Sequence, residues 1–435
     1  QFTKEQAEVV VKAAQCHHLR AAVHFIEDFQ KAGVRLEGLL GSTTVSDVVE
    51  ALRYFVTACR FQLPGALDAI KKSLTLIWRT EPPIEAAIKS AFVQVFVRPE
   101  TKDGDDDDDD VDDDHQPHHH PNAAQFVAKN LVTLVNESKA GELASLEEVV
   151  ASLVKDTLDK EKPTTLMLDP QRVFEQLWCA VGRRDQLPRA RAGALHAIAM
   201  GSSANPSLVN ELSRLDMLRE MALGRATMGA RDWRTVRCAC IALLSRCDPK
   251  VVMGSKEVDL IVQRLVYFLE GKWCAAVSAK SSDEERAVAD REMQDWFAAA
   301  EQVIAVLFHL NRAPEALGAA VVRRVAADAL SADDVSPHAL ARLCFVLGHL
   351  ALKLLVYAED LAGSLERARA KVKPPSKEKK AGDASDNDDD ATAQELGLNA
   401  EASAEDEQRL TELVEKEIVG RNLLGAFGPL LVSGR

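Results

Sequence analysis

Aromatic side chains are scarce in this chain: phenylalanine, tyrosine and tryptophan together make up 5% of its 435 residues. Alanine, leucine and valine supply most of the apolar side chains instead, a balance that suits closely packed helices better than β-sandwiches. Strand signals are missing as well. No stretch longer than five residues alternates cleanly between apolar and polar, and the Asn-Gly pair of tight hairpins does not occur. These absences favour an all-α fold.

Long apolar runs are also missing, because charged residues interrupt them before the roughly 18 residues that a membrane span needs. We therefore expect no transmembrane helix and no membrane partner. The chain begins with Gln1 instead of methionine and shows no signal-peptide pattern. Its last residues, 428–435 (GPLLVSGR), follow directly on an apolar, helix-like segment. Both ends suggest a piece of a larger protein.

Motifs for enzymatic chemistry do not occur. The sequence has no phosphate loop, no G-x-G-x-x-G after a strand, and no H-E-x-x-H, H-R-D or G-x-S-x-G. No nucleophile, base and orienting group can be assembled, so we expect no enzyme, no cofactor and no small-molecule substrate. His349 lies in an apolar helical stretch, where a hydrogen-bonded structural role is expected. His17 and His18 are expected at a helix start on the surface.

The eight cysteines of this 435-residue chain do not indicate a disulfide framework. Most cysteines lie within apolar helical patterns, which predicts reduced, buried thiols in an intracellular protein. Residues 238–240 (CAC) with Cys247 resemble a partial metal cluster, but no second pair or histidine partner has the spacing of a zinc site. We therefore expect no metal. The cysteines are Cys16, Cys59, Cys179, Cys238, Cys240, Cys247, Cys274 and Cys344.

Charge is present in excess, but it is concentrated in two places. The net charge is −14, and ten aspartates lie within residues 103–114 while five more lie within residues 383–390. Without these fifteen carboxylates the chain would carry about +1, so its folded part is not strongly acidic. Blocks of like charge repel themselves and bury little apolar surface, which predicts disorder at both places. They could mimic DNA, shield a basic surface or bind histones, but a solubilising loop is the simpler interpretation.

Apolar residues recur at helical spacing throughout the chain, most clearly between residues 39 and 97. Three stripes follow one another there, and each must be buried against a neighbouring helix. Such paired helices recur at roughly 35–45 residues, the period of HEAT or armadillo repeats. The stripes are Val45, Val48, Val49, Leu52, Phe55, Val56 and Cys59; then Leu63, Leu67, Ile70, Leu74 and Ile77; then Ile84, Ile88, Ala91, Phe92 and Val95.

The predicted fold class is therefore all-α, a HEAT/armadillo-type α-α superhelix with two disordered acidic insertions. We expect repeat helices in residues 1–98 and 122–372, with a disordered acidic and histidine-rich insertion at 99–121 between them. A disordered charged linker follows at 373–400. Further repeat helices are expected at 401–435.

Four blocks of the sequence resemble a known family in the same order as in that family. The first comprises residues 39–42 (LLGS), 44–47 (TVSD), 50–52 (EAL), 54–57 (YFVT) and 74–78 (LTLIW). The second comprises 295–304 (DWFAAAEQVI) and 314–317 (PEAL), the third 342–352 (RLCFVLGHLAL), and the fourth 415–418 (EKEI) with 422–424 (NLL). Together they are similar to the central HEAT region of the condensin complex subunit 1 family, over nearly all of the chain.

The resemblance implies a scaffold. Subunits of this family embrace the kleisin subunit, contact the SMC ATPase heads and help to hold DNA during mitotic chromosome condensation. The ATPase activity belongs to the SMC partners. The resemblance further implies a protein of the nucleus and chromosome that spends part of the cell cycle in the cytoplasm. The condensin II paralogue shares parts of the pattern, and a transport or adaptor-type HEAT solenoid is a further alternative.

Arginines recur near the expected turns between helices, where a solenoid would align them along one ridge. Such a stripe can follow a phosphate backbone without reading the bases. The alternative is ordinary solvated helix ends, where cations complement the helix dipole. Arg189 and Arg191 share this placement. The candidate phosphate contacts are Arg183, Arg184, Arg231, Arg234, Arg237, Arg323 and Arg324.

Three hydroxyl residues, Ser376, Ser385 and Thr392, lie in or beside the second charged segment. Phosphorylation there would add negative charge and could weaken DNA contact or alter docking. They are candidate modification sites.

Overall fold

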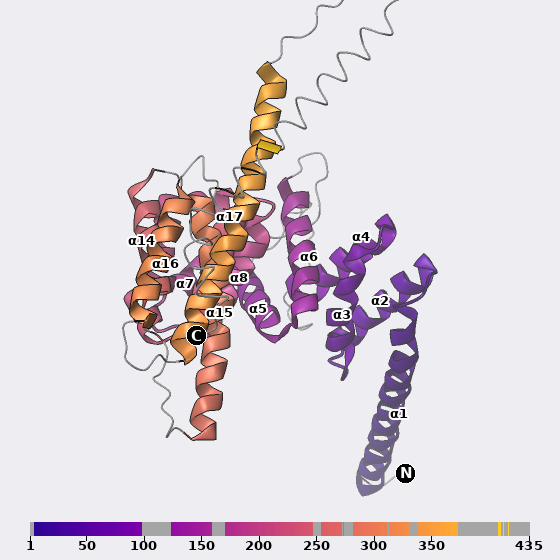
Figure 1. The fold of residues 1–435 in the computed structure, drawn as a ribbon. Coiled ribbons are helices and arrows are strands. Elements are labelled where there is room, and N and C mark those ends of the chain that lie inside the picture. Colours follow the sequence, from indigo (N-terminus) through magenta and orange to yellow (C-terminus); the bar gives the residue numbers. More distant parts are fainter. Residues whose placement is uncertain are drawn as a thin grey trace, which may run out of the picture. The chain divides into compact units, whose positions relative to one another are not determined.

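The computed structural model describes residues 4–97, 123–158, 170–246, 254–271, 273, 282–311, 313–330 and 337–372, with 408, 409, 412 and 416. These stretches are helical and hold no β-strand (Figure 1). The expectation of an all-α fold is confirmed. The expected insertions at 99–121 and 373–400 lie outside the described residues. So do the expected helices in 401–435, except for residues 408, 409, 412 and 416.

The chain divides into two compact units. Unit 1 comprises Gln1–Ala222 with Ile241–Asp248, and unit 2 comprises Leu223–Cys240 with Pro249–Arg435. The division passes through one helix, α12 (Trp233–Arg246). The domain boundaries expected at the two insertions stay predictions.

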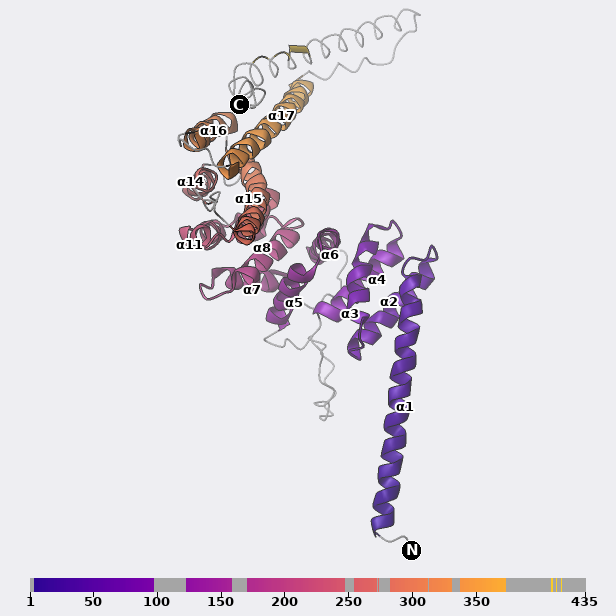
Figure 2. The same cartoon turned by 60° about the horizontal axis from the view of Figure 1, so that its bottom comes forward.

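Unit 1 stacks its helices in two rows. Its elements are α1 (Lys4–Leu39), α2 (Val45–Arg60), α3 (Ala66–Ser73), η1 (Leu74–Trp78), α4 (Pro82–Phe92), η2 (Val93–Val97), α5 (Ala123–Glu137), α6 (Ala140–Leu158), α7 (Pro170–Gly182), α8 (Pro188–Ser202), α9 (Ser207–Asn210), α10 (Leu212–Met217) and η3 (Leu218–Ala222). In one row α2 packs on α4, η2 on α5 and α5 on α7; in the other η1 packs on α6 and α6 on α8. Figure 2 shows α2 beside α4 and α5 beside α7. Packing each helix on an equivalent helix further along the chain is the arrangement of stacked helical repeats.

Unit 2 repeats this arrangement. Besides the start of α12 it contains α11 (Arg225–Gly229), α14 (Lys256–Glu270), α15 (Asp283–Leu310), α16 (Pro314–Leu330) and α17 (Pro337–Val372). Helix α14 packs on α15 and α16, and α17 packs on α15 and α16. A capping box starts α15, where Ser282 and Glu285 exchange side-chain to backbone hydrogen bonds. The helical pairing expected of a HEAT-type solenoid is therefore found within each unit.

The first expected stripe is confirmed in α2, where Val48, Leu52 and Phe55 are buried. The second is wrong at Leu67, which is 43% exposed. Gly65 takes a left-handed conformation with φ of 81°, so α3 begins only at Ala66 and presents Ala66, Ala69 and Ile70 to the core. A leucine directly after this turn falls on the outer face.

The third expected stripe ends differently from the prediction. Ile84, Ile88 and Phe92 are buried as expected, but the chain then forms a π-helical turn, η2, over Val93–Val97. The wider turn rotates the following side chains, so that Val93, Phe96 and Val97 are buried in place of Val95.

Helix α1 is largely unpacked in unit 1 and carries exposed apolar residues that include Leu19, Phe25 and Val34. Near its C-terminal part, Phe29 stacks on Tyr54 of α2 with ring centroids 4.5 Å apart. The Tyr54 hydroxyl donates a hydrogen bond to the Phe29 carbonyl oxygen. His17 and His18 lie in the middle of this helix, so the expectation of a helix start at these residues is wrong.

Within the described residues, one segment is long and apolar enough to cross a membrane: Pro337–Asp360 of α17, with a mean hydropathy of 1.9. The expectation that charges interrupt every apolar run is wrong here, because at most two charged residues fall in an 18-residue window. Leu343, Val346 and Leu350 of this segment are buried, and α17 packs on α15 and α16. One such helix is weak support for a membrane span, since core helices pass the same test.

Candidate functional site

Within the stretches that the structure describes, no three His, Cys, Asp or Glu side chains lie together so that they could hold a metal ion. Cys238 and Cys240 of the partial cluster are buried on α12, and Cys247 lies outside the described residues. Burial raises the pKa of the Cys238 thiol to about 11 and also raises the pKa of Cys240. Because zinc binds the thiolate, this apolar environment disfavours metal ligation at either sulfur.

The expectation of buried thiols is only partly met. Cys238 and Cys240 are buried and Cys59 is half-buried, but Cys16, Cys179 and Cys344 are exposed and free. Cys344 is exposed because α17 turns the neighbouring Leu343 and Leu347 inward. Cys179 is exposed for the same reason on α7, whose inward face carries Leu177, Trp178 and Val181.

Thiol alkylation at pH 8 should therefore separate these cysteines. Burial raises the pKa of Cys59 and Cys238 to about 11, which leaves about one thiol in a thousand ionised at that pH. We expect Cys179 and Cys344 to react at least about tenfold faster than Cys238. Site-resolved mass spectrometry after a maleimide pulse measures the rates. Equal rates at Cys238 and Cys179 would contradict the packing of α12.

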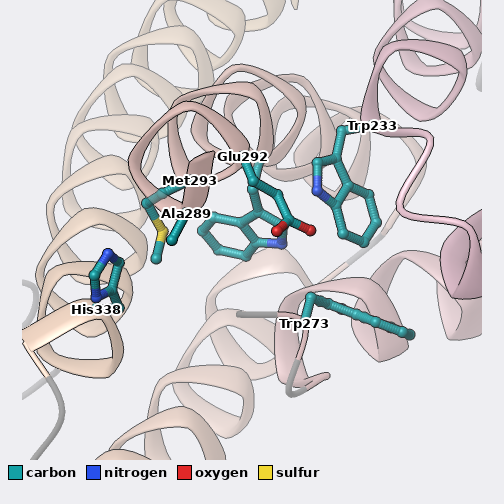
Figure 3. Close-up of a pocket in the computed structure, with 7 residues that line it drawn as sticks. Trp233, Trp273, Ala289, Glu292, Met293 and His338 are labelled. Atoms are coloured by element: carbon teal, nitrogen blue, oxygen red, sulfur yellow. The ribbon is translucent and has the colours of Figure 1, made fainter. Parts of the chain in front are cut away.

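A small cavity in unit 2 is surrounded by aromatic rings (Figure 3). In that view the carboxylate of Glu292 points toward the indole of Trp233, and His338 lies beyond Met293. The cavity measures about 10 Å³, which is room for about one water molecule. The rings around it pack on one another, with Trp233 and Trp273 centroids 5.6 Å apart. This cluster is therefore part of the core and does not admit an organic ligand.

Two candidate phosphate contacts of unit 2 are engaged in ion pairs. The Arg231 guanidinium lies 2.9 Å from both carboxylate oxygens of Glu292 on α15. Arg231 also has a positive φ of 55°, at the turn between α11 and α12. Arg324 on α16 lies 2.9 Å from a carboxylate oxygen of Glu270 on α14. These pairs reduce the positive charge that either arginine offers to a phosphate.

Arg234 and Arg237 lie on the exposed side of α12, opposite the buried Trp233 and Val236. Asp232 directly precedes the helix, and its carboxylate accepts hydrogen bonds from the backbone N–H and the hydroxyl of Thr235. Its first turns therefore present two outward arginines one helical turn apart. Arg323 on α16 is exposed, and its Nε donates to the Ala319 carbonyl oxygen of its own helix.

The candidates of unit 1, Arg183 and Arg184, are exposed on the turn between α7 and α8. Arg191 is not a surface cation: it is 9% exposed, and its Nη2 donates to the Arg183 carbonyl oxygen at 2.8 Å. It anchors the turn. Arg189 is exposed and donates to the Asn136 carbonyl oxygen at the end of α5 at 2.9 Å. Arg183 and Arg189 thus lie at the edge of a groove between α5, α7 and α8.

This α5–α7 groove has a volume of about 470 Å³. Its lining contains three cationic residues and no carboxylate. The lining residues are Gln125, Ala128, Lys129, Val132, Thr133, Asn136, Gln176, Leu177, Cys179, Ala180, Arg183, Gln186, Leu187, Arg189 and Ala190.

A second groove of about 590 Å³ lies between α2 and α4, in the same row of helices as α5 and α7. Its floor includes Ala86, Ala87 and Val49, and its cations are Arg53 and Arg60. Both are engaged: Arg53 pairs with Glu50 of its own helix, and the Arg60 guanidinium donates to the Gln94 side chain at 3.0 Å.

The exposed arginines could be identified from the sequence, but the positions of the grooves could not. Nothing in the sequence indicated that Lys129 belongs to the site. It lies 54 positions before Arg183, and the two residues line the same groove only because α5 packs on α7. The structural role expected of His349 is confirmed: the His349 Nδ1 lies 3.2 Å from the Phe345 carbonyl oxygen, and its ring stacks on Phe345. The buried Arg342, which donates to the Leu269 carbonyl oxygen, was not foreseen.

No protein-family model matches the chain. Curated relatives do match it, over nearly its whole length. Condensin complex subunit 1 of Mus musculus is 23% identical over 98% of this chain, and that of Homo sapiens is 24% identical over 98%. Condensin-1 complex subunit CAP-D2 of Arabidopsis thaliana is 22% identical over 95%.

The resemblance to condensin complex subunit 1 that the four blocks predicted is confirmed by these matches. The chain spans 29% of the length of the mouse and human relatives and 27% of the length of the Arabidopsis relative. It therefore corresponds to less than a third of each of these proteins.

Proposed function

We propose that this chain is a non-catalytic scaffold segment of a condensin complex, which binds kleisin and assists DNA engagement during mitotic chromosome condensation. The observation that carries the proposal is the match of 95–98% of the chain to proteins named condensin subunits. Stacked helices with open grooves suit this role, because grooves between repeats receive extended partner segments. We further propose that it acts in the nucleus, on chromosomes, and resides in the cytoplasm for part of the cell cycle.

Within this proposal we favour condensin I over condensin II, since one relative is named a condensin-1 subunit. The SMC ATPase subunits would be the further partners, and the ATP hydrolysis would be theirs. An ATPase assay on the chain without SMC subunits should show background only.

Pull-down with the cognate kleisin tests the proposal. The recombinant full-length protein should retain purified kleisin, and the 435-residue chain should retain it as well if the contacted grooves lie within it. A kleisin of an unrelated SMC complex serves as control. Failure of the full-length protein to retain any kleisin would overturn the scaffold function.

A second candidate function is sequence-independent DNA binding, which Arg234 and Arg237 favour by their exposure on one face of α12. Each phosphate contact contributes about 0.9 to the slope of log K against log salt concentration. Replacing both arginines by glutamine should reduce the slope by about 1.8. Arg231→Gln should change it little, because Arg231 pairs with both carboxylate oxygens of Glu292. Fluorescence anisotropy with duplex DNA at several salt concentrations measures the slope.

An unchanged slope in the Arg234→Gln, Arg237→Gln variant would remove α12 from the DNA surface. Arg183, Arg184, Arg323 and Arg324 stay further candidates that the same assay can rank. The candidate phosphorylation sites Ser376, Ser385 and Thr392 lie outside the described residues. Their proposed effect on DNA or partner binding would be refuted by phosphomimetic variants that leave both unchanged.

A further inference from the structure

The α5–α7 groove combines a one-sided charge with an apolar floor. Lys129 comes from α5, Arg183 from the α7–α8 turn and Arg189 from the start of α8. The three cations therefore approach the groove from three elements. The nearby Glu137 is held by Lys71 at 2.7 Å, and the exposed Asp185 of the turn is not among the lining residues. The groove itself presents only positive charge.

The floor between these cations is formed by small and aliphatic side chains. Ala128, Val132 and Ala180 line it from α5 and α7, and the fully buried Leu177 adjoins it. At the edge, Leu187 is 73% exposed. An exposed leucine beside an apolar floor is a surface that gains free energy when another apolar group covers it.

The groove has a fixed shape because α8 packs tightly beneath it. A Cβ atom on Gly193 of α8 would lie 2.8 Å from the Asn136 side-chain nitrogen and 3.1 Å from a methyl group of Val132. Glycine at this position lets α8 approach α5 without displacing the Asn136 and Val132 side chains. The buried Arg191 fixes the turn that carries Arg183. The groove is therefore preformed, which lowers the entropic cost of binding.

These features suit a peptide better than duplex DNA. Phosphate contacts need exposed cations on a ridge and make no use of an apolar floor. A volume of about 470 Å³ accommodates a few side chains, and polar amides such as Gln125, Gln176 and Gln186 can bond to a peptide backbone. An extended segment in such a groove would place apolar side chains on the floor and carboxylates against the edge.

We propose that the α5–α7 groove binds an extended peptide segment of a partner protein in which aspartate or glutamate residues flank leucine-like side chains. The carboxylates pair with Lys129, Arg183 and Arg189, and the apolar side chains cover Ala128, Val132 and Ala180. The choice of a protein ligand rests on the proposed scaffold function, but the test requires no condensin subunit.

Cys179 provides a reporter, because this exposed free thiol lines the groove. A synthetic peptide of alternating leucine and aspartate should slow the alkylation of Cys179 in the whole chain at least about tenfold. Cys344, exposed on α17, should react at its original rate and is the internal control. Mass spectrometry reads both rates. An unchanged rate at Cys179, or equal protection of both thiols, would overturn the assignment.

Three probes distinguish other ligands. A leucine–lysine peptide and a peptide that copies residues 103–114 should each bind at least about tenfold more weakly than the leucine–aspartate peptide, and duplex DNA should not protect Cys179. Equal binding by the leucine–lysine peptide would overturn the charge argument. Equal binding by the copy of 103–114 would make the chain's own acidic run the occupant, and protection by DNA would make the groove a nucleic-acid site. Each result overturns the proposal.

Matched variants test whether the residues that line the groove bind the peptide. Lys129→Glu with Arg183→Glu should weaken peptide binding, measured by fluorescence anisotropy, at least about tenfold. Arg20→Glu with Arg291→Glu, which alters the net charge equally at exposed sites on α1 and α15, should leave it unchanged. Ala180→Leu should weaken binding by filling the floor while retaining a good helix former. Equal loss in the control pair would mean that only net charge matters.

If kleisin binds but this peptide does not, the groove assignment fails while the scaffold function stands.

Discussion

Replacement of Trp296 by alanine is expected to lower the free energy of unfolding of unit 2 by about 3–5 kcal/mol. The Trp296 side chain is 1% exposed. It stacks on Phe268 with centroids 5.5 Å apart, and Phe345 packs against its edge. The Arg342 guanidinium lies 5.0 Å from the ring centroid. Removal of the indole would leave a large cavity and would also remove the cation–π contact of a buried arginine.

Urea denaturation followed by far-UV circular dichroism measures this loss. Trp78→Ala is the matched control, because Trp78 is 60% exposed and its main specific contact is a hydrogen bond from its Nε1 to the Ser145 hydroxyl. The control should lose about 1 kcal/mol. Equal losses in the two variants would contradict the central place of Trp296 in the core.

Replacement of Gly201 by alanine is expected to destabilise unit 1 by about 2 kcal/mol or more. Gly201 lies in the last turn of α8 and is buried against the ring of Phe174 on α7. An added Cβ would lie 1.8 Å from the Cζ atom of Phe174, so the ring or the helix has to move. Phe174 is 3% exposed and has little space to move into. The overpacking cost exceeds the gain of about 1 kcal/mol from replacing a helical glycine.

The Gly348→Ala variant separates the gain in helix propensity from the cost of overpacking. Gly348 lies inside α17 on its exposed face, and no atom lies within 4 Å of a Cβ built there. This variant should be as stable as the parent or more stable by up to about 1 kcal/mol. The thermal unfolding midpoints of the parent and of the two variants, measured side by side, test both predictions. A stabilising Gly201→Ala would show that α7 and α8 are not packed as described.

Much of the fold could be predicted from the sequence, because burial follows helical periodicity when helices are regular. Val48, Leu52 and Phe55 illustrate this in α2. The predictions failed at Leu67 and Val95, where a left-handed glycine and a π-helical turn change the angle between successive side chains. Such local changes of helical phase leave little trace in an apolar pattern.

The candidate site was less predictable, because it depends on contacts between distant segments. The exposure of Arg234 and Arg237 could be foreseen from the pattern of α12. The pairing of Arg231 with Glu292 could not, because 61 positions separate these residues. The α5–α7 groove likewise depends on two helices separated by α6 and by residues outside the described ranges. The family resemblance, by contrast, could be recognised from short blocks in order.

The most direct test of the condensin assignment is affinity purification of the full-length protein from its own mitotic cells, followed by quantitative mass spectrometry. We expect a kleisin and two SMC ATPase subunits in near-equal amounts with the tagged protein, and we expect them to persist after nuclease treatment. A purified protein that lacks kleisin and SMC subunits, or that carries transport cargo in their place, would contradict it.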